Sequence, residues 1–376
     1  IEMEDVVVTG MAPRKVSGFT GRYVTVKGDQ LKKLNPNNLL QALQLFDPSF
    51  RIVENNTAGS DPNALPEFRL RGDVQLGQGA TGSSADFQML MGDYSNRPNM
   101  PLFILDGFET TLQRIIDLDP ERVESITILK DAAGTALYGS RASNGVLVFE
   151  TKKSLSGALN VSYSMNLGVT TPDLSDYNLM NAAEKLEFER LAGYYGDLDV
   201  NGEIVSEGYQ QLYYQRLAEV KRGVDTYWMS EPLRFATSHS HNLFAEGGDD
   251  RMRYGIGFSY NKTQGVMKGS DRDVLNGNVR LMYRYKTVAF TNYLNLDYTM
   301  SSRENVSFSE FSRANPYHRK LNEYGEPDQV METYTDSDVN SSSYLKTLNV
   351  YNPLFDMILN SSNESRSFGF RNNFEI

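Results

Sequence analysis

The stretch LNVSYSMNLGV at residues 159–169 decides the fold. Its odd-numbered positions are all apolar and its even-numbered positions are Asn, Ser or Gly. Because successive side chains of a β-strand point to opposite faces, this strict alternation predicts one long strand with an apolar and a polar face. Soluble strands are most often about 5–6 residues long, whereas a tilted strand that crosses a bilayer needs about 9–11. The length therefore favours a transmembrane strand.

The same alternation returns further along the chain. It occupies Met252–Asn261, Asn278–Lys286, Val288–Met300 and Phe368–Ile376, and more weakly His239–Glu246. We expect the apolar face of these strands to lie toward lipid and the polar face toward a lumen. Val161, Tyr163, Ile256, Phe258, Leu281 and Phe290 face lipid, and Ser162, Gly257, Arg280 and Asn295 face the lumen.

The connections between these strands alternate in length. Gly247–Asp250 and Lys286-Thr287 are tight turns, whereas Thr170–Ser238, Lys262–Asn276 and Ser301–Ser365 are long and polar. Short turns on one side and long loops on the other are typical of an up-and-down barrel in an outer membrane. The alternative is an ordinary soluble β-sandwich, which would have shorter strands.

Composition excludes several classes of protein. The chain has 376 residues, with 37 basic and 48 acidic side chains, and its net charge of −11 disfavours nucleic acid as a partner. The absence of Cys excludes a disulfide scaffold, thiolate zinc and thiol catalysis. The 22 Tyr and 19 Phe suit a β-rich protein with aromatic girdles. No run of apolar residues is long enough for a transmembrane helix, and the first residues do not form a signal peptide.

The first part of the chain mixes helix and strand signals. Asn35-Pro36-Asn37 begins a helix, and a second short helix is predicted around Ala132–Tyr138. The predicted strands are Phe50–Glu54, Phe68–Arg71, Leu102–Leu105, Val123–Leu129 and Val146–Phe149. We therefore expect an α/β domain followed by antiparallel transmembrane β-barrel strands. The expected boundaries are 1–20 for an arm and linker, 21–153 for the α/β domain and 154–376 for the barrel strands.

A longer motif makes the interpretation specific. Residues 128–146 read ILKDAAGTALYGSRASNGV, which closely resembles the plug signature of the SusC/RagA family of TonB-dependent outer-membrane transporters. Asp5–Gly10 resembles the TonB box of that family, Leu70–Gly72 its plug strand, and Pro101–Gly107 the strand and turn before the signature. The order of these segments also follows the family, although Gly72–Asn99 is longer and more irregular than its pattern.

The resemblance implies a function. It implies active import of an oligosaccharide or oligopeptide across the outer membrane of a Gram-negative cell, with energy from TonB and with a SusD-like surface lipoprotein over the barrel. No catalysis, cofactor or metal is expected, and the substrate-binding residues are unknown. The family's barrels have about 22 strands. Because the six strands found here cannot enclose a plug, we expect the chain to be a piece of a longer polypeptide.

The arm is the expected site for TonB. Its β-branched run can add as a strand to the sheet of another protein, with main-chain hydrogen bonds giving affinity. An alternative is a disordered leader or an extra plug strand. The residues assigned to TonB binding are Asp5, Val6, Val7, Val8, Thr9 and Gly10.

The plug signature is expected to be structural rather than to contact substrate. Gly139 and Gly145 permit turns that other residues would obstruct, and Lys130, Asp131 and Arg141 can form ion pairs inside a polar lumen. The full set comprises Arg71, Gly72, Asp106, Gly107, Lys130, Asp131, Tyr138, Gly139, Arg141, Asn144 and Gly145.

Three other signals in the sequence are discounted as functional sites. Gly77–Gly82 matches a dinucleotide fingerprint but lacks its helix, His239 and His241 lack a third metal ligand, and Asp249-Asp250 is an exposed turn.

Two other functions stay open. A passive outer-membrane porin or a surface adhesin would keep the barrel without a functional TonB box. A soluble α/β enzyme with an appended sandwich would need a convergent titratable site, which the sequence does not show.

Overall fold

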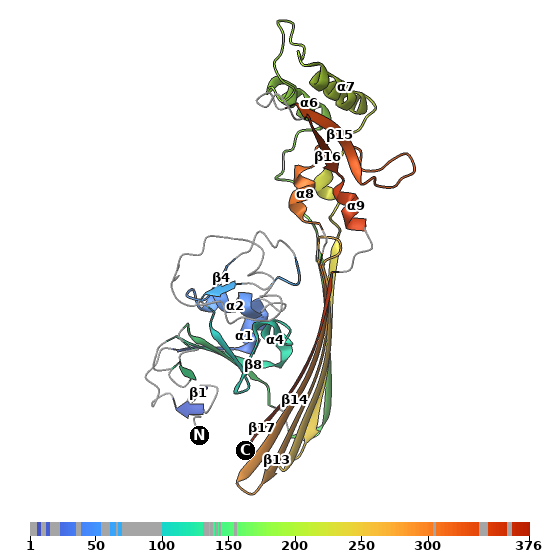
Figure 1. Ribbon diagram of the computed structural model, residues 1–376. Helices are drawn as coiled ribbons and strands as arrows, with labels where there is room; N and C mark the ends of the chain where they lie inside the picture. The colour runs from blue at the N-terminus through green and yellow to red at the C-terminus, as the bar shows by residue number, and fades with distance from the viewer. Residues whose placement is uncertain are drawn as a thin grey trace.

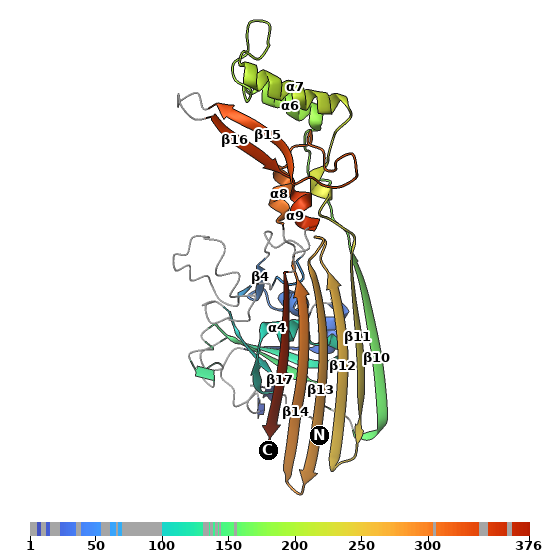
Figure 2. The same cartoon turned by 45° about the vertical axis from the view of Figure 1, so that its right-hand side comes forward.

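The computed structural model divides the chain into three parts, a plug, a curved wall of long strands and a head above the wall (Figures 1 and 2). We define the head as residues 171–235 and 303–363, which connect strands of the wall. The structure describes residues 6–8, 13–15, 23–34, 39–53, 61–64, 67–69, 100–130, 135, 138–139, 142, 144–153, 156–303, 306–337, 345–358 and 363–376.

The plug is built on a five-stranded sheet with the order β3-β8-β9-β6-β7. Its β6 and β9 are parallel and its other neighbours are antiparallel. The strands are β3 (Tyr23–Lys27), β6 (Leu102–Leu105), β7 (Phe108–Thr110), β8 (Val123–Leu129) and β9 (Val146–Thr151). The α/β domain is therefore present, and the expected strands at β6, β8 and β9 are confirmed.

Short helices cover the plug sheet. They are α1 (Gly28–Leu34), α2 (Leu39–Phe46), α4 (Leu112–Ile116) and the 3₁₀ turn η3 (Pro120–Arg122). Leu31, Leu43 and Leu112 from these helices pack with Ile126 and Phe149 of the sheet in one buried core. Consecutive residues are buried in Ile126–Leu129 of β8 and in Val146–Phe149 of β9, so both faces of these strands are covered there. The helix expected after Asn37 is confirmed as α2.

Two predicted strands of the plug lie outside its main sheet. β4 (Arg51–Val53) and β5 (Glu67–Arg69) pair with each other in a separate two-stranded sheet. The helix predicted around Ala132–Tyr138 falls mostly outside the described residues.

The wall is one antiparallel sheet of six strands with the order β10-β11-β12-β13-β14-β17 (Figure 2). Each strand has 12 to 15 residues, as a transmembrane strand requires. The strands are β10 (Gly157–Thr170), β11 (Ala236–Gly248), β12 (Met252–Gln264), β13 (Asp271–Tyr285), β14 (Val288–Ser302) and β17 (Glu364–Glu375).

The two faces of the wall separate as the alternation predicts. Val161, Ile256 and Leu281 are 56%, 50% and 41% exposed on the convex face, whereas Asn242 and Ser259 are buried on the face toward the plug. On the convex face of β13 the side chains are uncharged from Tyr285 to Leu275 and acidic at Asp273 and Asp271. Ten residue steps of a strand tilted by about 40° rise roughly 26 Å, close to the roughly 25 Å apolar band of a membrane barrel.

One predicted loop is wrong. The polar segment Lys262–Asn276 is not a long loop, because β12 and β13 stay paired as far as Gln264↔Asp271. The connection is only Gly265–Ser270. The prediction took the end of the apolar face as the end of the strand, whereas the backbone ladder continues through polar residues.

The other two long connections fold into the head instead of staying irregular. Its elements are α6 (Ala182–Leu191), α7 (Glu207–Lys221), η5 (Trp228–Ser230), α8 (Phe308–Arg313), β15 (Val330–Ser337), β16 (Leu345–Tyr351) and α9 (Pro353–Ile358). Of the helices that the structure describes, none has the length and apolar character needed to cross a membrane.

A buried arginine joins the elements of the head. Arg216 of α7 is 3% exposed and donates to Glu332 of β15 from Nε at 3.1 Å and from Nη2 at 2.6 Å. Its Nη1 donates to the hydroxyl of Tyr195 at 2.9 Å, and Tyr195 donates to Glu189 of α6 at 2.9 Å. His318 lies beside this network, with Nε2 at 3.9 Å from Glu332 Oε2. The two halves of the head are therefore held together by charge as well as by apolar packing.

Candidate functional site: the seam between plug and wall

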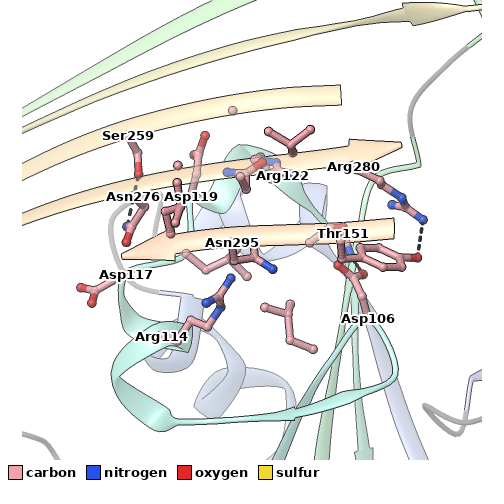
Figure 3. Close-up of a pocket in the computed structure, with 18 of the residues that line it drawn as sticks. Asp106, Arg114, Asp117, Asp119, Arg122, Thr151, Ser259, Asn276, Arg280 and Asn295 are labelled. Atoms are coloured by element: carbon pink, nitrogen blue, oxygen red, sulfur yellow. Dashed lines mark hydrogen bonds between the residues drawn. The ribbon is translucent and has the colours of Figure 1, made fainter. Parts of the chain in front are cut away.

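A crevice of about 90 Å³ lies between the plug and the wall (Figure 3). The plug side is formed by the β6–β7 turn, α4 and η3, and the wall side by β11, β12, β13, β14 and β17. We call this space the seam crevice. Because the contacts along this seam join the two main parts of the chain, they are the candidate functional site.

The turn between β6 and β7 shapes the plug side. Asp106 and Gly107 have φ values of 48° and 87°, a left-handed conformation that Asp tolerates and Gly adopts freely. The Asp106 carboxylate accepts hydrogen bonds from the backbone N–H and the hydroxyl of Thr151, both at 2.8 Å. The turn is therefore fastened to the end of β9, and β7 leads directly into α4.

Helix α4 and the turn η3 present three charged side chains to the wall. Asp117, directly after α4, accepts two hydrogen bonds from Arg272 of β13, both at 2.8 Å. Arg114 pairs with Asp297 of β14 at 3.3 Å. Arg122 donates to Asn278 of β13 and lies 4.6 Å from the centre of the Phe244 ring.

A second plug segment holds the end of the wall nearest the head. Asn63 Nδ2 donates to the backbone carbonyls of Ser302 at 2.8 Å and Asp271 at 3.3 Å. Its neighbour Asp61 pairs with Arg303 at 3.4 Å. The plug is thus attached at two levels of β13 and β14.

Five of the seven signature residues that the structure describes lie in the plug away from the seam. Lys130 pairs with Asp47, 3% exposed, at 2.6 Å. Gly139 and Gly145 have φ values of 68° and 97°, and Asn144 donates to the carbonyl of Met100 at 3.4 Å. These contacts are within the plug.

The remaining signature residues divide into two groups. Burial raises the pKa of the Tyr138 hydroxyl to about 12, and Asp106 lines the seam crevice. Arg71, Gly72, Asp131 and Arg141 lie outside the described residues. The structural role of the set stays a prediction.

The sequence did not single out the side chains that make the seam. Arg114, Asp117 and Arg122 of the plug and Arg272 of the wall were not predicted, whereas Arg280 was placed on the lumen face. Arg272 carried no usable signal, because charged residues lie on both faces of β13 at its level, with Asp271 and Asp273 on the convex face, so a partner in the lumen was not required. The identity of its partner, 155 positions away in Asp117, was not readable.

The expected TonB-binding segment is partly described. Val6–Val8 forms β1, which pairs with β2 (Pro13–Lys15) in the register Val7↔Arg14. Asp5, Thr9 and Gly10 lie outside the described residues. A strand in a two-stranded sheet uses one of its two edges for pairing, so β1 could still pair with another protein along the other edge.

The two discounted histidines lie on the convex face of the wall. His241 Nδ1 is 2.7 Å from the hydroxyl of Tyr163, and the rings of His239 and His241 are 5.2 Å apart. Across the described part of the chain, no three His, Asp or Glu side chains are grouped so that they could hold a metal ion.

Comparison with known proteins identifies the parts. Residues 16–146 match the family described as TonB-dependent Receptor Plug Domain. TonB-dependent receptor SusC of Bacteroides thetaiotaomicron is 26% identical over 287 residues, which are 74% of this chain and 24% of SusC. TonB-dependent receptor P3 of Formosa agariphila is 26% identical over 314 residues, which are 82% of this chain and 25% of that receptor. The chain therefore spans about a quarter of the length of these relatives.

Solved structures show the same fold. The RagAB peptide importer in the open-open state superposes with a TM-score of 0.65 at 20% identity, covering 93% of this chain and 38% of that chain. The closed-closed state gives 0.66 at 18% identity, covering 95% and 39%. Residues 16–146 thus match a TonB-dependent receptor plug domain, and the chain as a whole, with its plug and six wall strands, is similar to the SusC and RagAB transporters.

Proposed function

We propose that this chain is part of an importer that takes an oligosaccharide or an oligopeptide across the outer membrane with energy from TonB. The observation that carries the proposal is the seam itself. The plug is attached to the wall by ion pairs and hydrogen bonds at two levels, near the head through Arg272 and Asn63 and further from it through Asn278 and Asp297. A plug held in this way closes a passive route, so transport needs work to move it.

The N-terminal arm is the proposed point where that work enters. β1 lies at the end of the plug away from the head (Figure 1). Its valines are β-branched, and its unpaired edge suits pairing with a strand of TonB. Asp5, Val6, Val7, Val8, Thr9 and Gly10 are the proposed contact.

The head is the proposed contact for a SusD-like lipoprotein. SusC and the RagAB importer supply the analogy, and the head stands above the wall, where a lid over the barrel would rest (Figure 2). Uptake in this scheme involves binding and movement and no catalysis. The RagAB structures are those of a peptide importer, and the family resemblance of the sequence leaves oligosaccharides open as well.

Deletion of residues 4–10 in the full-length transporter tests the proposal. Cells should lose uptake of the nutrient, while surface binding and the amount of folded protein stay unchanged. Val7→Pro or Val8→Pro should act in the same way, because proline removes a main-chain donor, and alanine at the same positions should be milder. Undiminished uptake after the deletion would contradict energised import and support a passive pore, whereas loss of folded protein would give the arm a structural role.

A further inference from the structure

Four arginine side chains line the seam crevice, Arg114 and Arg122 from the plug and Arg280 and Arg371 from the wall. Figure 3 shows Arg114, Arg122 and Arg280 around the crevice. A guanidinium group removed from water needs a charged or a strong hydrogen-bonding partner, because its desolvation is costly. The partners of these four groups therefore show whether each positive charge in the crevice has a negative partner.

Within the described residues, only one of the four arginines donates to a carboxylate. Arg114 pairs with Asp297. The other three donate to neutral acceptors: Arg122 to the Asn278 amide oxygen, Arg280 Nη2 to the Tyr293 hydroxyl at 2.9 Å, and Arg371 Nη1 to the Thr110 hydroxyl at 3.2 Å. Arg280 Nη1 is buried and has no hydrogen-bond partner among the described residues.

The arginines also face one another across the seam. Burial lowers the pKa of the Arg114 guanidinium, and the neighbouring Arg371 lowers it further. Burial likewise lowers the pKa of Arg122, where the attraction of Asp106, Asp119 and Glu246 is opposed by the repulsion of Arg280. Each plug arginine therefore has a wall arginine as an electrostatic neighbour.

The aspartates of the crevice are engaged with other groups. Asp106 accepts from Thr151 through both oxygens, and Asp117 accepts from Arg272 through both oxygens. Asp119 accepts from the backbone N–H of Glu121 at 2.9 Å, and burial raises its pKa. Within the described residues, Arg280 Nη1 therefore has no acceptor and Arg122 donates to the neutral Asn278 amide, although neighbouring carboxylates also attract Arg122.

We propose that the seam crevice binds a small oxyanion, a phosphate, sulfate or carboxylate group, between Arg122 and Arg280, with Arg114 and Arg371 beside it. The planar guanidinium fork matches the oxygens of such groups and can donate two parallel hydrogen bonds. About 90 Å³ is room for several water molecules or one such ion. The proposed anion site does not depend on the import proposed above, because its arginines already lie together in the plug and wall that the structure describes.

Binding of radiolabelled inorganic phosphate to the purified full-length transporter tests this site. Equilibrium dialysis at low ionic strength should show one saturable phosphate per protein. The double variant Arg122→Gln with Arg280→Gln should bind at least tenfold more weakly. Arg366→Gln is the matched control, because Arg366 is 63% exposed on β17 and outside the crevice, and this variant should bind like the wild type.

Two further measurements make the test decisive. Arg280→Lys keeps the charge but loses the planar fork, so it should bind phosphate more weakly than the wild type and more tightly than the double variant, which separates loss of charge from a folding defect. Competition with trigalacturonate, and with neutral maltotriose as its control, identifies the source of the bound anion. Displacement of phosphate by the acidic sugar but not by the neutral one indicates that a carboxylate carried by a transported molecule reaches the site. Displacement by unlabelled phosphate alone indicates a free ion. Absence of saturable binding, or equal binding by the double variant, would overturn the proposal.

Discussion

Arg272 of the barrel wall and Asp117 of the plug are joined by two parallel hydrogen bonds of 2.8 Å, and both side chains are 10% exposed. The pair connects β13 with the residue directly after α4, and 155 positions of sequence separate its two members. A bidentate pair of this kind fixes orientation as well as distance. It is therefore the contact whose loss should most directly loosen the plug.

Asp117→Asn or Arg272→Gln should weaken the attachment of α4 to the wall. Removing one partner of a buried pair leaves the other charge uncompensated, at a cost of about 3–5 kcal/mol. Hydrogen exchange of residues 108–118 in the full-length transporter should become faster in each single variant. The double variant should lose less than the sum of the two, because no unpaired charge remains. Unchanged exchange in both single variants would show that the pair does not hold the plug.

Arg216→Leu should destabilise the head. The side chain is 3% exposed and is the common partner of Glu332 and Tyr195, so its removal leaves Glu332 without its bidentate donor at a cost of about 3–5 kcal/mol. Arg222→Leu, on the same helix but 62% exposed, should cost at most about 1 kcal/mol. Exchange of the α7 amides measures both, and equal effects in the two variants would contradict the central role of Arg216.

The head should lose stability in mild acid. Burial lowers the pKa of His318 from its ordinary 6.5 to about 4, with Arg216 lowering it and Glu332 opposing. Above pH 6.5 the histidine is neutral in both the folded and the unfolded state, so it has no effect on stability there. Between pH 6.5 and 4 the unfolded state binds a proton that the folded state excludes, and stability falls by up to about 3 kcal/mol.

Exchange of the α7 amides at pH 7 and pH 5, corrected for intrinsic rates, measures the effect. His318→Gln should flatten this pH dependence. An identical acid response in that variant would assign the loss to other groups.

Gly28→Ala should strain the plug. A Cβ on Gly28 would lie 2.0 Å from the carbonyl oxygen of Val123, so α1 would have to move away from β8, at a cost of about 1–3 kcal/mol. Gly208→Ala is the control, because a Cβ there has no atom within 4 Å and alanine favours a helix. Faster exchange of β8 amides is expected only in the first variant, and tolerance of alanine at Gly28 would mean that α1 can shift freely.

The strands of the wall were predictable because their two faces meet different environments. Lipid on one face and a polar lumen on the other impose a period of two, which Leu159–Val169 shows without exception. Where the convex face leaves the lipid, at Asp273, that constraint ends although the ladder continues to Asp271. This is why the strand was predicted too short and the following loop too long.

The short elements of the plug and the contacts of the seam were less readable. Helix α4 has five residues, too few for a helical period, and β7 has three. Asp106 was identified because its turn belongs to a local motif. Arg114 and Arg122 gain their role from wall residues more than 120 positions away, a distance over which residue spacing carries no information.

The continuation of β13 beyond its apolar side chains sets the height of the head. From Leu275 to Asp271 the tilted strand rises roughly 10 Å above the last apolar side chain. The upper part of the wall is thus a collar that stands clear of the lipid, with the plug still attached to its rim through Asn63. In the importer that we propose, a molecule passing from the head toward the plug would meet protein well before it reaches the depth of the bilayer.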